Sequence, residues 1–481
     1  MATRILAKIL PRTEYGNDAN DNRRDPDYLE GIEPKNPNMQ LSAMHMAATQ
    51  NVTEDNVAVV FEDVFKEKFR YCPQRSKWLE YVSTHFQEEE TGLVRNQIRD
   101  LVREINTSNH ATAARASFIS GVETLMKSSR IFAVHGSKFD QDNFLLNTPG
   151  GTYNLRSPFD LKPHDPLDLI THITRVSPSE ANGGLFHKFL GQITVNDKEL
   201  EEFLQVSLGA MLSGAIEDHW IMFWVGSGRN GKNVLGDLIQ KVLGTYAKKV
   251  PSATLLSTNS ETHPTTLANL QGIRVAISSE IPEGSFMNEA LVKELTGDTT
   301  ISARKMRQDF FEFNRTHKHL VYGNTRPQIR SIDQGMQSRI RIVPFNACFA
   351  GKEDTSLPEK LWSEAPYVLN WLMRGHQKWL DKQKKLGTCA AAEAATSDYF
   401  ASQSTPDLWL EECCLIVVDN GETGRFWNTS NELYESYSEW KRERGEKPMS
   451  HTRWGEFMAA KFERRKSNGT RYTGVKLAPI G

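Results

Sequence analysis

The 481-residue chain has few cysteines, no long apolar run and almost no net charge. Its five cysteines include no Cys-x-x-Cys pair, so a zinc site is not supported and reduced thiols are the simpler interpretation. No run of about 18 or more apolar residues is present, and the N-terminus lacks the apolar segment of a signal peptide. These absences predict a soluble cytoplasmic protein without a membrane partner. The formal net charge of −2 identifies no partner, because an even total can hide separated basic and acidic regions.

The first half of the chain also lacks a catalytic constellation. Its histidines are scattered, and each is interpreted as structural or solvated: His85, His110, His135 and His164. Apolar periodicity predicts a small mixed α/β domain, built from helices near 57–69, 93–105 and 114–127, a strand at 78–82 and a Pro-Gly-Gly hairpin at 144–155.

One stretch in the middle of the chain has the order of elements found around a phosphate-binding loop: a strand, a glycine-rich loop, a lysine and a helix. An apolar run at 220–225 precedes it, and a helical pattern at 234–243 follows it. Glycines let backbone N–H groups turn inward, a helix N-terminus favours anions, and a lysine reaches the phosphates of ATP. The spacing fits the Walker A pattern, while a glycine-rich turn that merely precedes a helix is the alternative. The expected ATP-binding residues are Gly226, Ser227, Gly228, Arg229, Asn230, Gly231, Lys232 and Asn233.

Three further apolar runs carry polar residues at their ends. Glu280 ends the run at 272–280, where an acid can hold magnesium or the attacking water. Asn324 ends the run at 319–324, and its amide can orient that water. Arg339 begins the run at 339–345, and an arginine there can complete the site of a neighbouring subunit. The alternatives are a turn role for Asn324 and a surface cation for Arg339.

The candidate ligands of Mg²⁺ are Asn233 and Glu280. Asn233 stands where the Walker A pattern usually has a hydroxyl, and its amide oxygen can coordinate the ion or a bound water. Ser279 precedes Glu280, so a single carboxylate is present where an acidic pair is common. The sequence therefore leaves open which residue holds the ion.

Two basic segments are candidates for nucleic-acid contact. A hairpin is predicted over 301–313, where Lys305 and Arg307 alternate and would share one face of a strand; a solvated edge hairpin is the alternative. Near the C-terminus, a helix expected to be capped by Ser430, a second helix from Ser450 and a hairpin with an Asn-Gly turn follow the winged-helix order. The candidate phosphate contacts there are Arg453, Arg465, Lys466 and Arg471. A protein-interaction domain with a basic face is the alternative.

Together, these motifs resemble the series of superfamily 3 helicases, most closely the phage/plasmid and poxvirus-type primase–helicase family. The resemblance is specific for about residues 200–345 and extends loosely over the hairpin near 147–155. It implies an AAA+-like core in a hexameric ring that translocates on single-stranded DNA, typically 3′→5′. It assigns Lys232 to the phosphates, Glu280 to Walker B, Asn324 to the sensor, Arg339 to the finger, and Lys305 with Arg307 to the DNA hairpin.

The resulting expectation is an α/β protein with an AAA+-like P-loop ATPase core. The expected segments are a poorly ordered tail (1–50), an N-terminal α/β domain (51–185), the core (186–350), a helical extension and linker (351–406) and a winged-helix-like domain (407–481). The tail is too short for a priming module, so a separate primase or host replication proteins are expected partners.

The leading hypothesis is an ATP-dependent DNA helicase of phage, prophage or plasmid replication, acting on single-stranded and forked DNA in a bacterial cell. An ATP-switched origin-binding initiator without processive unwinding is the alternative. A P-loop kinase of a small molecule is disfavoured, because it would leave the basic segments without a task.

Overall fold

A computed structural model describes ten segments of the chain: residues 52–105, 115–157, 160–257, 264–306, 309–329, 333–403, 405–416, 427–443, 447–466 and 469–478. The tail expected at 1–50, Arg307 and Asn468 of the expected turn lie outside them. The chain divides into two compact units. The first comprises residues 1–141 with 164–171, and the second comprises residues 142–163 with 172–481.

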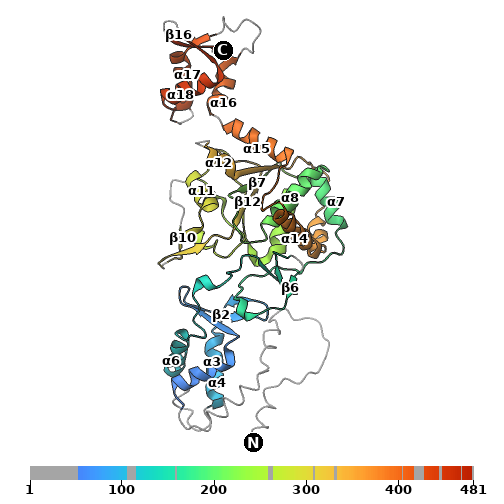
Figure 1. Ribbon diagram of the computed structural model, residues 1–481, viewed down its shortest axis with the longest axis vertical. Coiled ribbons are helices and arrows are strands. Elements are labelled where there is room, and N and C mark those ends of the chain that lie inside the picture. Colours follow the sequence, from blue (N-terminus) through green and yellow to red (C-terminus); the bar gives the residue numbers. More distant parts are fainter. Residues whose placement is uncertain are drawn as a thin grey trace. The chain divides into compact units, whose positions relative to one another are not determined.

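The first unit packs three helices against a small antiparallel sheet of order β1-β2-β3. Its elements are α3 (Glu54–Phe65), β1 (Phe69–Cys72), β2 (Lys77–Tyr81), β3 (Phe86–Glu88), α4 (Leu93–Ile105) and α6 (Ala116–Lys127), drawn in blue to cyan in Figure 1. The helices and the strand at 78–82 were predicted from apolar spacing. Phe61, Phe69 and Phe132 are fully buried at its centre, so this unit has an apolar core of its own.

The second unit is built on a five-stranded parallel sheet of order β13-β7-β12-β9-β8. The strands are β7 (Ile221–Val225), β8 (Ala247–Lys249), β9 (Val275–Ser279), β12 (Lys318–Gly323) and β13 (Ile340–Pro344). All four strands expected from apolar runs form. Gly323 lies opposite Val225, and Tyr322 lies opposite Ser279. The carboxyl ends of β7, β12 and β9 therefore meet at one edge.

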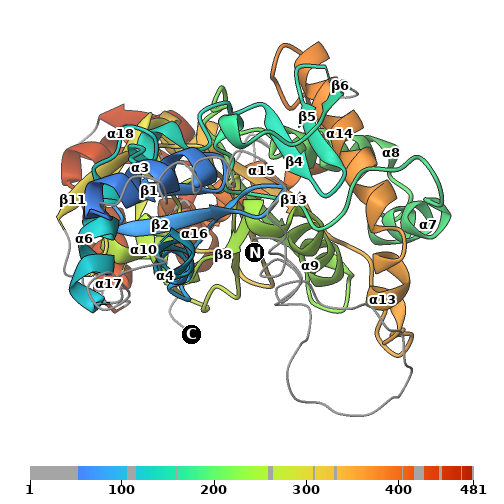
Figure 2. The ribbon, with the colours of Figure 1, turned by 90° about the horizontal axis from the view of Figure 1, so that it is seen from below.

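Alternating residues of the strands bury both faces of this sheet. Met222 and Trp224 pack on one face, and Ile221 and Phe223 pack on the other. The first face is covered by α7 (Gly184–Ile193), α8 (Lys198–Ala210), α9 (Lys232–Leu243), α13 (Leu357–Trp362) and α14 (Ala365–Asp381); the second is covered by α10 (Pro264–Ala268), α11 (Glu289–Gly297) and α12 (Gln334–Arg339). Figure 1 shows β7 and β12 between α8 and α14 on one side and α11 on the other, and Figure 2 shows α8 beside α14. The core is thus a three-layered α/β unit.

Two of the smaller sheets in this unit contain the hairpins predicted from the sequence. The predicted hairpin at 144–155 forms as β4 (Leu145–Thr148) and β5 (Gly151–Asn154), with β6 (Asp160–Lys162) beside β5. The sequence had placed this hairpin in a domain ending at 185, whereas it lies in the second unit with the parallel sheet. The hairpin predicted over 301–313 forms as β10 (Thr300–Arg304) and β11 (Phe310–Asn314).

The C-terminal part of the second unit contains helices and short antiparallel strands. They are α15 (Ala390–Gln403), α16 (Thr405–Cys413), β14 (Cys414–Ile416), β15 (Trp427–Thr429), α17 (Ser430–Glu443), α18 (His451–Lys461), β16 (Glu463–Lys466), β17 (Thr470–Thr473) and β18 (Val475–Leu477). One sheet has the order β15-β17-β16, and β14 pairs with β18. Tyr437 stacks on Trp454 with ring centroids 4.6 Å apart. We call residues 405–478 of this part the terminal domain.

The caps of its two central helices can be compared with the sequence prediction. The helix expected from Ser450 forms as α18, and Ser450 is its N-cap. The cap predicted for α17 at Ser430 is wrong, since Thr429 takes that role. The Thr429 hydroxyl accepts the Glu432 N–H at 3.2 Å, and the Glu432 carboxylate accepts the Thr429 N–H at 2.9 Å. This reciprocal pair satisfies two backbone donors at the start of the helix.

A buried cluster of basic side chains lies around the start of β12. His317, Lys318 and His319 are almost fully buried, and Lys318 Nζ donates to the carbonyl oxygen of Ala215 at 2.7 Å. Among the described residues, neither ring nitrogen of His317 or His319 has a hydrogen-bond partner. Burial lowers the pKa of His319 to about 3 and that of His376, on α14, to about 4, and it lowers the pKa of His317 as well.

The buried histidines predict acid sensitivity. In the unfolded chain they bind protons as the pH falls through about 6.5, while in the folded chain they stay neutral until lower pH. The unfolded state therefore binds more protons, and stability falls between pH 6.5 and about pH 4 by about 1.4 kcal/mol per pH unit for each histidine. The urea midpoint at several pH values should decline less steeply for His319→Leu than for the wild type. The exposed-site control His135→Asn should keep the wild-type slope, and equal slopes for all three proteins would contradict this account.

No helix in the described part of the chain is long and apolar enough to span a membrane.

Candidate nucleotide and nucleic-acid sites

The glycine-rich loop connects β7 to α9 at the carboxyl edge of the parallel sheet. Its backbone is left-handed at Gly228 (φ 94°), Arg229 (φ 49°) and Gly231 (φ 83°). A Cβ at Gly231 would lie 2.4 Å from Ile193 Cγ2, and a Cβ at Gly226 would lie 2.3 Å from the Phe345 carbonyl oxygen. Glycine is therefore required at both positions, and the helix that follows directs its N-terminus toward the loop.

The segment after β13 fixes this loop. Asn230, only 1% exposed, donates from Nδ2 to the Phe345 carbonyl oxygen at 3.0 Å. The Phe349 N–H donates to the Arg229 carbonyl oxygen at 2.8 Å, and the Arg229 guanidinium lies 3.1 Å from the Glu353 carboxylate. Sequence spacing offered no signal for these contacts, because they join segments more than 100 residues apart. Among the residues predicted to bind ATP, Asn230 thus also holds the loop in shape.

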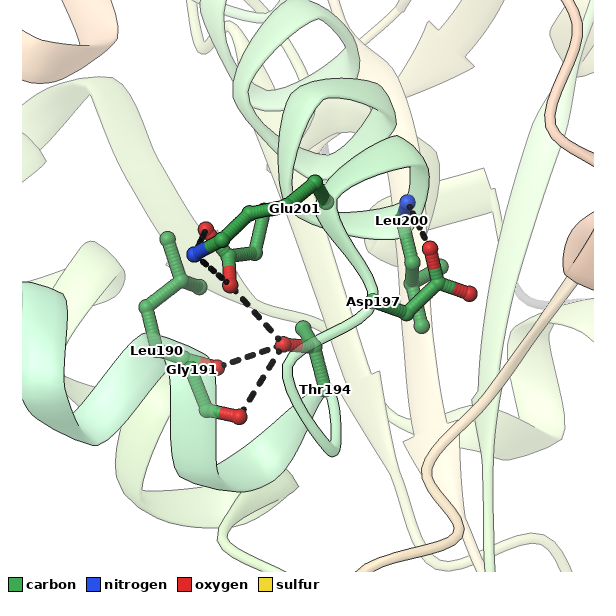
Figure 3. Close-up of polar contacts among 7 residues, drawn as sticks. Leu190, Gly191, Thr194, Asp197, Leu200 and Glu201 are labelled. Atoms are coloured by element: carbon green, nitrogen blue, oxygen red, sulfur yellow. Dashed lines mark hydrogen bonds and ion pairs between the residues drawn. The ribbon is translucent and has the colours of Figure 1, made fainter.

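The corner between α7 and α8 packs behind the loop through Ile193. The Thr194 hydroxyl donates to the carbonyl oxygens of Leu190 at 2.9 Å and Gly191 at 3.3 Å, and it lies 3.4 Å from Glu201 Oε1 (Figure 3). These bonds let α7 turn sharply into α8, whose first turn is capped by Asp197. The hydrogen-bonded corner therefore fixes the position of Ile193, which packs against Gly231.

Lys232 is the first residue of α9 and is only 3% exposed. Its Nζ donates to Asn324 Oδ1 at 2.6 Å and to the Gly226 carbonyl oxygen at 3.2 Å. Burial lowers the pKa of Lys232, and the Glu280 carboxylate opposes that shift. The loop, Lys232, Asn324 and Glu280 thus come together at one edge, as strand order in a parallel sheet requires.

Glu280 directly follows β9 and adopts a left-handed backbone with φ 57°. Its N–H donates to the Tyr322 carbonyl oxygen at 3.3 Å, and its own carbonyl oxygen accepts from the Ser252 hydroxyl at 3.1 Å. A non-glycine residue in this conformation is strained by roughly 1–3 kcal/mol, and such strain gathers at functional sites. The side chain is exposed, so its carboxylate is available to a ligand.

The candidate magnesium ligands offer few donors by themselves. Asn233 is exposed in the first turn of α9, and Glu280 is exposed at the end of β9. The described residues contain no group of three or more His, Cys, Asp or Glu side chains suited to a metal ion. One carboxylate and one amide oxygen fit an ion that takes its other ligands from nucleotide phosphates and water.

Tyr322 and Asp237 form a pair that the sequence did not indicate. The Tyr322 hydroxyl donates to Asp237 Oδ1 at 3.0 Å, and burial raises the pKa of this tyrosine. A Cβ at Gly236 would lie 2.6 Å from the Tyr322 ring, so the glycine lets α9 approach β12 closely. The pair ties the helix after the loop to the strand that ends at Asn324.

Arg339 lies at the end of the sheet where the parallel strands begin, opposite to the end that carries the glycine-rich loop. It ends α12 immediately before β13, and Ile340 is paired with Ile221, the first residue of β7. Its guanidinium donates to Thr296 Oγ1 at 3.0 Å and to the Gly335 carbonyl oxygen at 2.8 Å. The five residues of β13 separate Arg339 from Phe345 beside the loop, and these six steps of extended chain span roughly 20 Å. The structure therefore does not bring Arg339 together with Lys232, Glu280 and Asn324 of the same chain.

The β10–β11 hairpin has an exposed end. β10 stops at Arg304, so Lys305 is a half-buried residue of the connection rather than of the strand. The shared strand face predicted for Lys305 and Arg307 is therefore not formed by Lys305, and Arg307 lies outside the described residues. Met306 is 71% exposed, and Phe310 is 59% exposed with the Arg304 guanidinium 4.8 Å from its ring centroid. The hairpin thus presents cations and apolar groups together.

The basic residues predicted in the terminal domain lie on different surfaces. Arg453 is exposed in the first turn of α18. Arg465 and Lys466 are neighbours on β16 and point to opposite faces of the sheet. Arg465 lies opposite Arg471 of β17 and is paired with Glu463 at 3.1 Å. The predicted residues are therefore not one contact patch, and only Arg465 and Arg471 share a face.

Two family models match the chain. Residues 58–195 match the family described as D5 N terminal like, and residues 224–339 match a family of unknown function, DUF5906. The first covers the expected N-terminal α/β domain, and the second runs from β7 to Arg339. The D5-like match supports the resemblance to primase–helicases that was inferred from motifs. The assignment to superfamily 3 stays a prediction.

Several similar proteins come from large DNA viruses. "Putative helicase L207/L206" of Acanthamoeba polyphaga mimivirus is 29% identical over 217 residues, covering 44% of this chain and 22% of that protein. "Putative helicase 184R" of Invertebrate iridescent virus 6 is 26% identical over 289 residues, covering 56% and 29%. "Putative primase C962R" of African swine fever virus (strain Badajoz 1971 Vero-adapted) is 23% identical over 326 residues, covering 63% and 33%. The match thus spans a third or less of each relative.

Among solved structures, "The A form apo structure of NrS-1 C terminal region-CTR" aligns with a TM-score of 0.47 and 11% identity, covering 85% of this chain and 96% of that one. The bacterial host expected from the motif resemblance gains no support from the viral relatives, which come from viruses of eukaryotes.

Proposed function

We propose that the chain is the ATP-driven helicase part of a DNA replication protein. The observation that carries the proposal is the meeting of Lys232, Asn324 and Glu280 at the carboxyl edge of a parallel sheet, beside a glycine loop in left-handed backbone. Phosphate-binding loops of ATPases occupy this position in α/β sheets. The viral relatives named as helicases and primases support the same activity.

Each residue has a part in the proposed ATP site. The loop from Gly226 to Gly231 and the start of α9 bind the phosphates, and Lys232 neutralises charge on them. Asn233 and Glu280 would hold Mg²⁺ together with the phosphates, and a bound ion would supply stabilisation of the developing negative charge. Asn324 orients the attacking water. The core is in this proposal a P-loop core of the AAA+-like, superfamily 3 kind.

The position of Arg339 favours a site shared between subunits. An arginine at the far edge of the sheet cannot approach the phosphates held by its own loop, so it acts on ATP only from a neighbouring copy. Such head-to-tail contacts close into rings or continue as filaments. We therefore propose a ring, in keeping with the hexamer of the resembling family.

The DNA contacts are divided between two parts. The end of the β10–β11 hairpin, with Arg304, Lys305 and Phe310, is proposed to follow one strand through phosphate and stacking contacts, without reading sequence. The terminal domain has the helix-helix-hairpin order of a winged helix, and Arg453 on α18 is proposed to contact duplex phosphates.

Strand displacement on a forked DNA tests the proposal. The purified chain with ATP and Mg²⁺ should hydrolyse ATP faster when single-stranded DNA is added, and it should release the labelled strand. Vigorous hydrolysis with origin-length duplex bound and no displacement would favour an ATP-switched initiator instead. Absence of any ATP hydrolysis would refute both.

Lys305→Ala should uncouple hydrolysis from movement. Because Lys305 lies in the connection of the hairpin, its loss should weaken contact with the tracked strand while leaving the ATP site untouched. We expect displacement to fall about tenfold, because loss of a phosphate-contacting lysine weakens binding to every sequence alike, and basal ATP hydrolysis to stay within twofold. Lys188→Ala, an exposed lysine of α7, is the matched control. Full displacement by Lys305→Ala would refute the role of the hairpin.

A further inference from the structure

The outer face of the β15-β17-β16 sheet carries an exposed aromatic ring beside an arginine. Trp427 of β15 is 37% exposed, and the Arg471 guanidinium carbon lies 3.9 Å from its ring centroid. Among the described residues, Arg471 Nε is buried and has no hydrogen-bond partner. A cation this close to an indole ring fixes the ring, and contact with a ligand would fall to the terminal Nη groups of the guanidinium rather than to Nε.

The register places these groups on one surface. Trp427, Thr473 and Glu463 form one cross-strand row, and Thr429, Arg471 and Arg465 form the next row on the same face. The opposite face carries Tyr472, whose hydroxyl donates to the Gly455 carbonyl oxygen of α18 at 3.1 Å. The Trp427 face is therefore directed away from α18, the helix proposed to meet duplex DNA.

The charges around Trp427 are mixed, with Arg465 and Arg471 set against Glu463 and Glu432. Arg465 is engaged by Glu463, and Glu432 is held by Asn428 and by the main chain of Thr429, with Arg471 a weaker contributor to its lowered pKa. The Arg471 guanidinium thus lies over an aromatic ring and also interacts with the Glu432 carboxylate. A ring with an adjacent cation is the arrangement that binds an unpaired base together with its phosphate.

We propose that this sheet face is a binding site for single-stranded DNA, with a base stacked on Trp427 and the adjoining phosphate bound by Arg471. The site rests on the proposed DNA binding of the terminal domain and names its substrate as the unpaired strand. With α18 on the other side of the sheet, one terminal domain holds duplex and unpaired strand at the same time, as a fork presents them. Stacking tolerates every base, so the site has no sequence preference.

Binding of the full chain to a fluorescein-labelled 20-nucleotide oligo-dT and to a 20-base-pair duplex tests the site, in the wild-type and Lys305→Ala backgrounds. Trp427→Ala should weaken binding of the single strand about tenfold and leave duplex binding within twofold, since one stacked base contributes roughly that much. Trp427→Phe should retain most of the affinity. Leu415→Ala, which removes another exposed apolar side chain of the same domain (48% exposed), should change neither.

Tryptophan fluorescence gives an independent readout. Oligo-dT should quench the wild type more than Trp427→Phe, because only a stacked base quenches that ring directly. Equal quenching of the two proteins, or unchanged single-strand affinity of Trp427→Ala, would overturn the proposal. Equal loss of single-strand and duplex binding with a lowered melting temperature would also overturn it, since Trp427 would then be structural. ATP hydrolysis measured in the same samples separates failure of this site from failure of the proposed helicase function.

Discussion

Lys232→Ala is expected to reduce ATP hydrolysis by about 10²–10³-fold or more, since loss of one preorganised group that stabilises transition-state charge has this effect. The side chain is 3% exposed and its Nζ lies 2.6 Å from Asn324 Oδ1. Nucleotide phosphates therefore displace an existing contact rather than meeting a free lysine. Steady-state phosphate release with saturating Mg²⁺ and ATP measures the effect.

The fold should survive this change. Burial lowers the pKa of Lys232 because the interior disfavours its charge. Removing the ammonium group relieves that penalty, so the melting temperature should change by only a few degrees. Lys248→Ala, at an exposed lysine of β8 whose Nζ bonds Asn269, is the matched control and should hydrolyse ATP normally. Retained hydrolysis in Lys232→Ala with an intact fold would refute the phosphate role.

Arg339→Ala should abolish hydrolysis while preserving nucleotide binding. An arginine supplied from a neighbouring subunit accelerates phosphoryl transfer about 10³–10⁵-fold. Roughly 20 Å of strand separates Arg339 from the loop of its own subunit, so it does not contribute to binding nucleotide there. Fluorescent ATP analogues should therefore bind with wild-type affinity as phosphate release disappears. Arg341→Ala, two residues further on in β13, is the matched control, and its hydrolysis should remain within tenfold of the wild type.

Mixing the two inactive variants distinguishes a shared site from a structural arginine. In an equal mixture of Lys232→Ala and Arg339→Ala, about a quarter of the interfaces pair an intact loop with an intact arginine. Hydrolysis should recover to about that fraction of the wild type. Because Arg339 also bonds Thr296 and Gly335, a merely structural role would lower the melting temperature of Arg339→Ala and give no recovery. The absence of recovery in mixed assemblies would refute the shared site.

Much of the core was accessible from the sequence because its strands are buried on both faces. Continuous apolar runs then mark each strand, and the residue after each run must lie at a sheet edge. For that reason the proximity of Glu280 and Asn324 to the loop followed from strand order. The sequence had assigned Arg339 to the site of a neighbouring subunit, and only the structure shows that it precedes its strand while Glu280 and Asn324 follow theirs.

The remaining features depend on contacts that spacing does not encode. The bond from Lys232 to Asn324 joins residues 92 positions apart, and the bond from Asn230 to the Phe345 carbonyl oxygen spans 115. Local details were missed for a different reason. Thr429 and Ser430 are both suited to capping, and only the structure shows that β15 ends at Thr429 and that α17 begins at Ser430. Trp427 gave no sequence signal, because a single tryptophan is more often buried than exposed.

β13 connects Arg339 to the phosphate loop of the same subunit, and this connection bears on the order in which subunits of an assembly hydrolyse ATP. Arg339 stands at one end of this strand, and the carbonyl oxygen that holds Asn230 of the phosphate loop stands just past the other. Hydrogen bonds to β7 along its length keep the strand from bending freely. In a ring of the proposed kind, a pull on Arg339 by the nucleotide of the neighbouring subunit would be transmitted along β13 to the loop of its own subunit. Successive subunits would then hydrolyse ATP in order around the ring, and no separate element would be needed to couple them.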